Sequence, residues 1–341
     1  MLTQLIKSCL RFVMRKFYKV FYGDTYYLGL ELLKNQVNAV VLSHSINGLH
    51  LEKIASLPFE QELSNFSKYQ LSDIEQFIHS LLKSIKYRKL TLVCGISLRQ
   101  VFSNIVQLNK ELGEHEVQQY LHHNFKRTKR FAKQSFEVRF QRVSSGSDKV
   151  NYYVAACEHH VLSNAKQVHT KIKADKKCIE LDSQAILRAI SVSTYQPLLA
   201  KSDWVFVFIK GETILLMMGS KSQLYFEQAI DLSEVGSVNV WSLEHFIIKT
   251  ITNKINTIPI TQPYHLLWCS DQISSPEYQQ ALISNVLAKE CLMHPVKLAI
   301  FKTILSSENI DNTTSLTDII IPLGLALKTC SLKACTLITS S

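Results

Sequence analysis

Glycine is scarce in this chain, with 10 residues among 341, where an average usage of about 7% would give more than twice as many. Loops that cradle phosphate groups depend on glycine, because its bare backbone turns tightly and lets a ligand approach closely. The scarcity therefore counts against several intact nucleotide-binding loops.

Long apolar runs and paired cysteine motifs are also missing. No stretch approaches the roughly 18 uncharged apolar residues of a membrane-spanning helix. The eight cysteines include no Cys-x-x-Cys pair and no second pair at zinc-site spacing. No cleavable secretion signal indicates an oxidising compartment. These absences predict a soluble or surface-bound protein with reduced, mostly buried thiols.

Signatures of enzymes are absent from the sequence as well. No Gly-x-Ser-x-Gly elbow or full P-loop occurs. The pairs His122-His123 and His159-His160 are adjacent in sequence, and neighbouring residues on a helix point about 100° apart, so they do not chelate one metal. We predict no catalytic and no metal-binding residues.

The composition that remains is that of a globular protein with room for two domains. Hydrophobic residues make up 46% of the chain and charged residues 19%. The formal net charge is +10, which favours contact with anionic lipid or acidic segments.

Residues 1–25 are predicted to form a basic amphipathic helix. Apolar residues recur there every three or four positions, and aromatic residues flank the apolar face. One interpretation is a helix that lies in a membrane interface; the other is a helix packed on its own protein. In the first case the membrane-facing residues would be Lys7, Arg11, Arg15, Phe17, Lys19 and Phe21.

The remaining chain alternates short apolar strands with amphipathic helices. The predicted strands are 26–31, 37–43, 49–57, 90–96, 101–108, 136–143, 150–157, 204–209, 213–218, 223–229 and 264–269. The predicted helices are 71–84, 114–125, 158–173, 242–255, 275–288 and 315–329, with a further strand and helix within 178–190. The compact succession from 98 to 167 indicates a small subdomain inserted in the first domain.

A basic stretch, residues 125–133, carries five cations in nine residues between Phe125 and Phe131. Charge and stacking aromatics can grip RNA or single-stranded DNA. Anionic lipid, an acidic partner and a merely solvated helix end are the alternatives, and we disfavour nucleic acid.

Several segments together resemble one protein family. They are Tyr27–Ser43, Leu98–Leu108, Val154–Leu162, Ile179–Ala189 and Asp318–Lys328, the last carrying Gly324, which would let this helix approach a neighbouring backbone. In this order they resemble the opening hairpin, inserted subdomain and closing helix of the actin-like family of type IV pilus assembly protein PilM, over roughly residues 26–330.

The resemblance implies an α/β, actin-like fold of two ribonuclease-H-like lobes facing a cleft, with a small α+β subdomain inserted in the first lobe. The implied division is a first lobe at 26–199 including subdomain 98–167, a second lobe at 200–314, a closing helix at 315–330 that returns to the first lobe, and a tail at 331–341.

The family's nucleotide loops depart from their pattern in this chain. Where the family has aspartate and small turn residues, Glu31, Lys34 and Asn35 occur. Phe208 and Lys210 replace an aspartate and a glycine in the second hairpin, and Cys269-Ser270 replaces a glycine pair. Two hypotheses remain open: a vestigial cleft in a non-catalytic scaffold, which we favour, or an active ATPase that holds ATP and magnesium through Glu31, Lys34 and Lys210.

The resemblance also implies partners and a location. It implies that the chain is a cytoplasmic, ring-forming component, peripheral to the inner membrane. This component would bind the N-terminal segment of a PilN-like inner-membrane protein, with pilus ATPases as further partners. Twitching motility and competence are the implied processes. By position, we predict the partner groove near Phe102, Ile105, Leu108, Leu121 and Phe125.

Overall fold

The computed structural model describes residues 25–33, 35–45, 48–59, 67–85, 87–145, 148–220, 223–231, 247, 249–251, 253–254, 258, 260, 264–270, 291–295 and 315–329. Outside these residues lie the predicted N-terminal helix with its six membrane-facing residues, Lys34, the predicted helix 275–288 and the tail 331–341. Within the predicted helix 242–255, residues 247, 249–251 and 253–254 are helical.

The first five-stranded sheet has the order β3-β2-β1-β4-β8. Its strands are β1 (Thr25–Leu32), β2 (Gln36–Ser45), β3 (Gly48–Pro58), β4 (Lys89–Ile96) and β8 (Lys176–Leu181). The first three strands form an antiparallel meander, and β4 and β8 continue the sheet in parallel to β1. Residues 26–57 and 178–181 therefore belong to one sheet, as a single first lobe requires.

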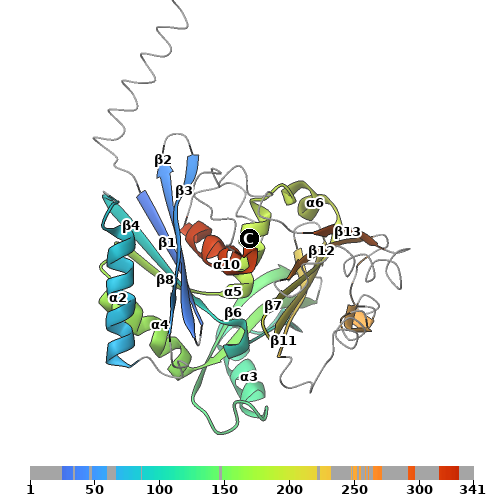
Figure 1. The fold of residues 1–341 in the computed structure, drawn as a ribbon. Coiled ribbons are helices and arrows are strands. Elements are labelled where there is room, and N and C mark those ends of the chain that lie inside the picture. The colour runs from blue at the N-terminus through green and yellow to red at the C-terminus, as the bar shows by residue number, and fades with distance from the viewer. Residues whose placement is uncertain are drawn as a thin grey trace, which may run out of the picture.

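Helices cover both faces of this sheet, which explains why β1 and β4 are almost continuously apolar. One core joins the sheet to α2 (Lys68–Leu82) and α4 (His159–Lys171). The other joins it to α5 (Asp182–Ser191) and α10 (Leu316–Ala326), and Figure 1 shows the two helix pairs on opposite sides. Helix α2 begins at a capping box, in which the hydroxyl of Ser67 and the amide of Gln70 satisfy each other's backbone N–H groups.

The second five-stranded sheet repeats the arrangement of the first, with the order β11-β10-β9-β12-β13. Its strands are β9 (Asp203–Lys210), β10 (Thr213–Ser220), β11 (Gln223–Asp231), β12 (Tyr264–Ser270) and β13 (Cys291–Pro295). Strand β13 was not predicted from the sequence. Again three antiparallel strands are followed by two parallel ones. The short helix α6 (Gln196–Lys201) stands between the two sheets in the chain.

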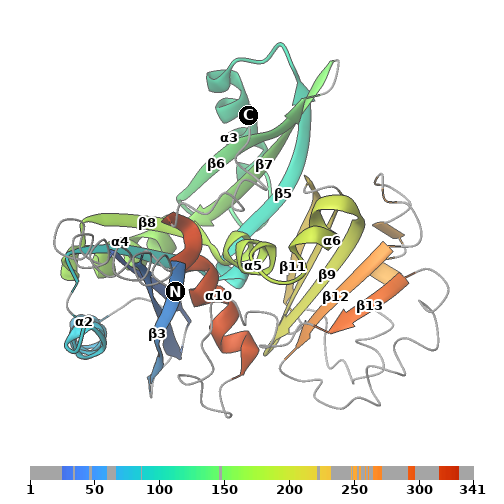
Figure 2. The same cartoon turned by 90° about the horizontal axis from the view of Figure 1, so that it is seen from above.

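The inserted subdomain is a three-stranded antiparallel sheet with one helix on it. Its order is β5-β7-β6, formed by β5 (Val101–Asn109), β6 (Phe136–Ser145) and β7 (Lys149–Glu158), with η1 (Leu98–Gln100) at its entrance. Helix α3 (Glu114–Lys126) packs its apolar face on this sheet. Figure 2 shows the subdomain rising from the junction of the two five-stranded sheets.

The closing helix α10, continued by η5 (Leu327–Thr329), returns to the first lobe between β1 and α5. Two glycines allow this approach. A Cβ at Gly324 would lie 1.8 Å from the carbonyl oxygen of Ala185, and a Cβ at Gly29 would lie 2.0 Å from that of Pro322. The prediction that Gly324 permits close backbone contact is confirmed, and so is the two-lobed actin-like fold.

The described cysteines agree with the prediction of mostly buried thiols. Cys94, Cys157, Cys178 and Cys269 are free, and all but Cys178 are buried. Burial raises the pKa of the Cys157 thiol to about 11, which keeps it protonated and unreactive near neutral pH.

Candidate functional site: the cleft and the subdomain cavity

An ion pair joins the two lobes at two of the positions that the resemblance assigns to the nucleotide loops, Glu31 and Lys210. Glu31, near the end of β1, is 0% exposed. The ammonium of Lys210, at the end of β9, donates to both carboxylate oxygens of Glu31 at 2.9 Å. The amide of Asn38 donates to Oε2 of Glu31 at 2.8 Å, and the hydroxyl of Ser56 donates to the oxygen of Asn38 at 2.7 Å. A charge from the second lobe is therefore held inside the first.

Two further carboxylates, those of Asp318 and Asp182, lie near this pair. Neither was predicted as a site residue from the sequence. Asp318, in the first turn of α10, lies 3.3 Å from the Lys210 ammonium. Asp182, the first residue of α5, is 1% exposed, and its Oδ1 has no hydrogen-bond partner. The signal for Asp182 was a carboxylate placed directly after a buried strand, at the start of a helix.

Burial and mutual charge set the ionisation of this cluster. Burial raises the pKa of Glu31, and the Lys210 ammonium opposes that rise through charge and hydrogen bonds. Burial alone lowers the pKa of Lys210, but attraction to Glu31 and Asp318 outweighs it, so this pKa is raised and Lys210 stays charged. Burial and then repulsion from Glu31 raise the pKa of Asp182 well above its usual value. The arrangement is thus one ammonium shared mainly by Glu31 and Asp318.

The other positions that the resemblance assigns to the nucleotide loops are occupied by packed side chains or closed by a backbone hydrogen bond. Phe208 and Cys269 are buried partners across neighbouring strands, packed in the core that joins both lobes. Ser270 is half-buried at the end of β12. The turn after β1 is closed by the N–H of Leu33 donating to the carbonyl of Gln36, and Asn35 there is exposed. Phosphate needs free backbone donors, whereas these positions show buried side chains and, at Leu33, an amide that is already paired.

The hairpin between β9 and β10 is tight, since Lys210 and Thr213 are cross-strand partners. Gly211 has a φ of 54° there, a left-handed conformation that glycine adopts readily.

Among the described residues, no group of three or more His, Cys, Asp or Glu side chains is arranged to hold a metal ion. The described part of the chain also has no helix of the length and hydrophobicity that crossing a membrane requires.

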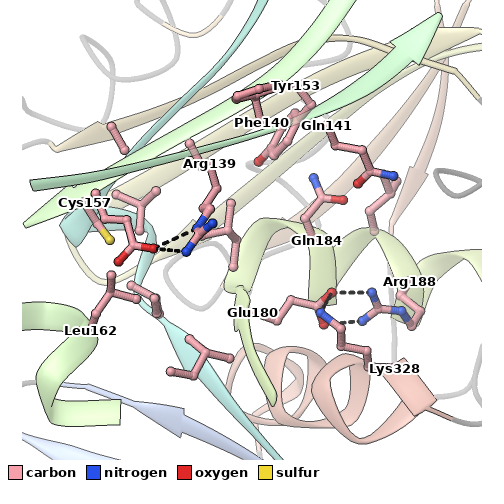
Figure 3. Close-up of a pocket in the computed structure, with 18 of the residues that line it drawn as sticks. Arg139, Phe140, Gln141, Tyr153, Cys157, Leu162, Glu180, Gln184, Arg188 and Lys328 are labelled. Atoms are coloured by element: carbon pink, nitrogen blue, oxygen red, sulfur yellow. Dashed lines mark hydrogen bonds and ion pairs between the residues drawn. The ribbon is translucent and has the colours of Figure 1, made fainter. Parts of the chain in front are cut away.

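A cavity of about 680 Å³ lies between the first lobe and the inserted subdomain. Strand β6 of the subdomain and strand β8 of the first lobe both contribute to its lining, and each is the last strand of its sheet. Figure 3 shows residues of the subdomain strands, among them Phe140 and Tyr153, facing residues of β8 and α5 across the cavity. Edge strands carry main-chain groups that can pair with an added strand.

The cavity combines apolar walls with ion pairs. Ile96, Val101, Leu162, Ile179 and Leu187 form much of its apolar lining. This mixture of an apolar surface with a few placed polar groups is typical of ligand and peptide sites.

Two ion-pair groups mark the opposite walls of the cavity. On the subdomain, Arg139 pairs with Glu137. On the first lobe, Arg188 holds both oxygens of Glu180, at 2.6 Å and 2.5 Å, and Lys328 approaches the same carboxylate at 3.0 Å. Arg188 also donates to the carbonyl of Gly324 at 2.9 Å, so this wall is fixed by the closing helix.

The residues predicted for the partner groove do not line this cavity. Leu108, Leu121 and Phe125 are buried in the subdomain core, where α3 packs on the far face of the sheet. Phe102 lies on that face against Phe125, and Ile105 packs toward the core between the lobes. The apolar face of α3 is therefore used to bind its own sheet, and the position of the partner groove stays a prediction.

The subdomain is also anchored to the second lobe. Arg99 pairs with Asp231 at 2.6 Å and with Glu212 at 3.4 Å. The hydroxyls of Ser103 and Tyr153 both donate to the buried carboxylate of Glu227 on β11. The cavity wall that carries Tyr153 is therefore held from both lobes.

Comparisons with known proteins bear on this geometry. The family model for type IV pilus assembly protein PilM matches residues 29–224, more than half of the 341 residues. No curated protein matches the chain.

Among solved structures, the chain is similar to a PilM-PilN type IV pilus biogenesis complex, with 13% identity, a TM-score of 0.66, and coverage of 88% of this chain and 97% of that one. Two others have TM-scores of 0.46 and 12% identity. One is a Bacteroides thetaiotaomicron protein with an actin-like ATPase fold and unknown function, covering 79% of this chain and 90% of that one. The other is the cytoplasmic domain of EpsL, an inner-membrane component of the type II secretion system of Vibrio cholerae, covering 81% and 90%.

Proposed function

The chain belongs to the family of type IV pilus assembly protein PilM, and on this premise we propose that it is a non-catalytic scaffold of a type IV pilus, competence or related secretion machine. In this proposal it binds the cytoplasmic N-terminal segment of a PilN-like inner-membrane protein. The observation that carries the proposal is the cavity between the edge strands β6 and β8.

An extended segment fits this cavity by the physics of strand addition. Main-chain groups of the segment would pair with β6 or β8, and apolar side chains would enter the lining around Leu162 and Leu187. The family resemblance and the similarity to a PilM-PilN complex support the choice of partner. A homo-oligomeric ring, contact with pilus ATPases, and attachment of residues 1–22 to the anionic inner leaflet complete the proposal.

The peptide site is tested with a cavity-filling variant. Ala155, half-buried on β7, lines the cavity. We expect Ala155→Trp to weaken binding of a synthetic N-terminal PilN peptide at least about tenfold, since the indole would occupy the space of the peptide. Isothermal titration calorimetry with the full chain measures the change.

The matched control is Tyr120→Ser, an exposed position on α3 and away from the cavity lining. Equal peptide affinity in Ala155→Trp and wild type would exclude this cavity as the peptide site. Leu121→Glu is unsuitable as a probe, because it would place a carboxylate in the subdomain core and unfold that core.

The non-catalytic half of the proposal is tested with nucleotide. A ligand that binds the folded state stabilises it by about 2.7 kcal/mol at 100 times its Kd. Because Lys210 and Phe208 occupy the positions that phosphates need, we expect no shift of Tm with millimolar magnesium-ATP in differential scanning fluorimetry. A clear upward shift that Glu31→Ala abolishes would favour the alternative, an ATPase with altered loops.

A further inference from the structure

A cluster of cations at the end of α3 is not used by the peptide site. The cluster, called here the basic loop, consists of Lys126, Arg127, Lys129, Arg130 and Lys133, all exposed. None of them lines the cavity. It therefore needs an account separate from the binding of the PilN-like segment.

The basic loop is presented on a fixed turn. The hydroxyl of Thr128 donates to the carbonyl of Phe125 at 2.7 Å, and the N–H of Ala132 donates to the carbonyl of Thr128 at 3.0 Å. Phe125 and Phe131 anchor both ends of the turn in the subdomain core. The cations are thus held outward together at little further cost in backbone entropy.

Neighbouring carboxylates do not neutralise these cations. Arg130 donates to the carbonyl of Arg99 at 3.0 Å and lies over the ring of Phe131. Within the described part of the chain, the other four cations form no ion pair. By contrast, Arg99, Arg139 and Arg188 each pair with a carboxylate. The basic loop therefore presents concentrated positive charge to solvent.

The aromatic residues around the loop favour a lipid surface over nucleic acid. Binding of single strands relies on exposed aromatic rings that stack on bases, but Phe125 and Phe131 are both buried. The ring of Phe102 is 40% exposed and packs edge-on against Phe125, with centroids 5.3 Å apart. An apolar ring beside a ring of cations is the combination found where proteins rest on a membrane interface.

The basic loop also borders the cavity. It leads directly into β6, whose second residue, Glu137, lines the cavity. The charge of Arg130 acts on the thiol of Cys157 in the cavity wall. A segment of an inner-membrane protein bound there would bring this edge of the subdomain toward the leaflet from which it emerges.

We propose that the basic loop, with Phe102, binds the anionic headgroups of the membrane surface beside the bound segment; this rests on the proposed function for its orientation. The membrane is preferred to an acidic peptide because none of these cations lines the cavity in which a peptide would be held. The subdomain would then be held at two points, by the basic loop on the membrane surface and by the partner segment in the cavity.

The test is co-sedimentation of the full chain with vesicles made of equal parts phosphatidylglycerol and phosphatidylcholine, with pure phosphatidylcholine vesicles alongside. The variant replaces Arg127, Lys129 and Lys133 with Gln. Its matched control replaces Lys83, Lys173 and Lys176, which are equally exposed and give the same change in net charge. Residues 1–22 are present in every chain, so their contribution cancels in the comparison.

We expect the loop variant to bind the anionic vesicles roughly tenfold to a hundredfold more weakly than wild type, from the contribution of each basic residue near a charged surface. The control should lose far less affinity for the anionic vesicles. Binding of the three chains to neutral vesicles should not depend on the loop. Equal losses in variant and control, or no loss in the variant, would overturn the proposal.

The PilN peptide, titrated without vesicles, separates this proposal from the function it rests on. Unchanged peptide affinity in the loop variant supports membrane contact by the loop. Reduced peptide affinity with unchanged vesicle binding would assign the cations to the partner and overturn the membrane proposal. Loop-dependent vesicle binding in a chain that fails to bind the peptide would leave the membrane contact standing and refute the peptide site. The contribution of the N-terminal segment is measured separately, as the loss of vesicle binding in a chain that lacks residues 1–22.

Discussion

Gly324→Ala is expected to lower the free energy of unfolding by about 3 kcal/mol, the upper end of the usual range for overpacking a core. A Cβ at this position would lie 1.8 Å from the carbonyl oxygen of Ala185 and 2.4 Å from its carbonyl carbon. Both are backbone atoms of α5, which cannot rotate aside as a side chain can. Helix α10 would have to withdraw from α5, and the hydrogen bond from Arg188 to the carbonyl of Gly324 would be lost with it. Urea denaturation followed by circular dichroism measures the change.

Gly29→Ala should behave similarly, because its Cβ would lie 2.0 Å from the carbonyl oxygen of Pro322 on the same helix. The control is Gly113→Ala, where the nearest atom is 3.6 Å away and φ is −69°. Gly113 is a helix N-cap, so its replacement costs less than about 1 kcal/mol. A Gly324→Ala protein as stable as the Gly113→Ala protein would contradict the close packing of α10 on α5.

Local pattern predicted the elements of this fold well, because the strands of both lobes carry their own signals. The runs at 90–96 and 204–209 are continuously apolar, and the structure buries both faces of β4 and β9. Gly324 stood out because an apolar helix seldom carries glycine without a packing reason. Strand β13 gave no such signal, since Cys291–Pro295 is short and mixed in character.

The candidate site could not be predicted in the same way, because it is formed by contacts between residues far apart in the sequence. Glu31 and Lys210 are 179 positions apart in sequence, and each was named for the residue it replaces in the family. Their pairing depends on how two different sheets are placed relative to each other. Asp182 and Asp318 were visible only as polar residues at helix starts, where a capping role explains a carboxylate equally well.

The prediction of a partner groove on α3 rested on periodicity, which does not tell a partner-binding face from a packed one. Leu121 and Phe125 define an amphipathic face of α3, and that pattern is the same whether the face binds a partner or its own sheet. Here the sheet β5-β7-β6 covers it. The cavity is instead built from edges, namely β6 and β8, whose availability depends on the strand order of two different sheets.

Lys210→Met is expected to lower the free energy of unfolding by about 3–5 kcal/mol, the cost of breaking a buried ion pair by removing one partner. Glu31 would keep the hydrogen bond from Asn38 and lose both bonds from the ammonium while remaining fully buried. The double variant Glu31→Gln with Lys210→Met should recover most of that loss, because the fully buried charge of Glu31 is gone and Asp318, the other partner of the ammonium, has a side chain 37% exposed to solvent. Chemical denaturation of the four proteins in this cycle gives the coupling between the two side chains.

Asp182→Asn serves as the control for charge in the cluster. Burial and repulsion from Glu31 hold the pKa of Asp182 well above its usual value, so a neutral amide should change stability much less than Lys210→Met does. A loss below about 1 kcal/mol in Lys210→Met, within the range of exposed ion pairs, would mean that Glu31 does not depend on Lys210 for its burial.

The same variant distinguishes an interlobe contact from a contribution to partner binding. Lys210 belongs to the second lobe, and the residues that line the cavity come from the first lobe, the subdomain and Lys328 of the closing segment. At a temperature where Lys210→Met remains folded, its affinity for the PilN peptide should therefore equal that of wild type. In this chain a tethered cation would then hold the two lobes together across the cleft, while the partner is recognised elsewhere on the first lobe.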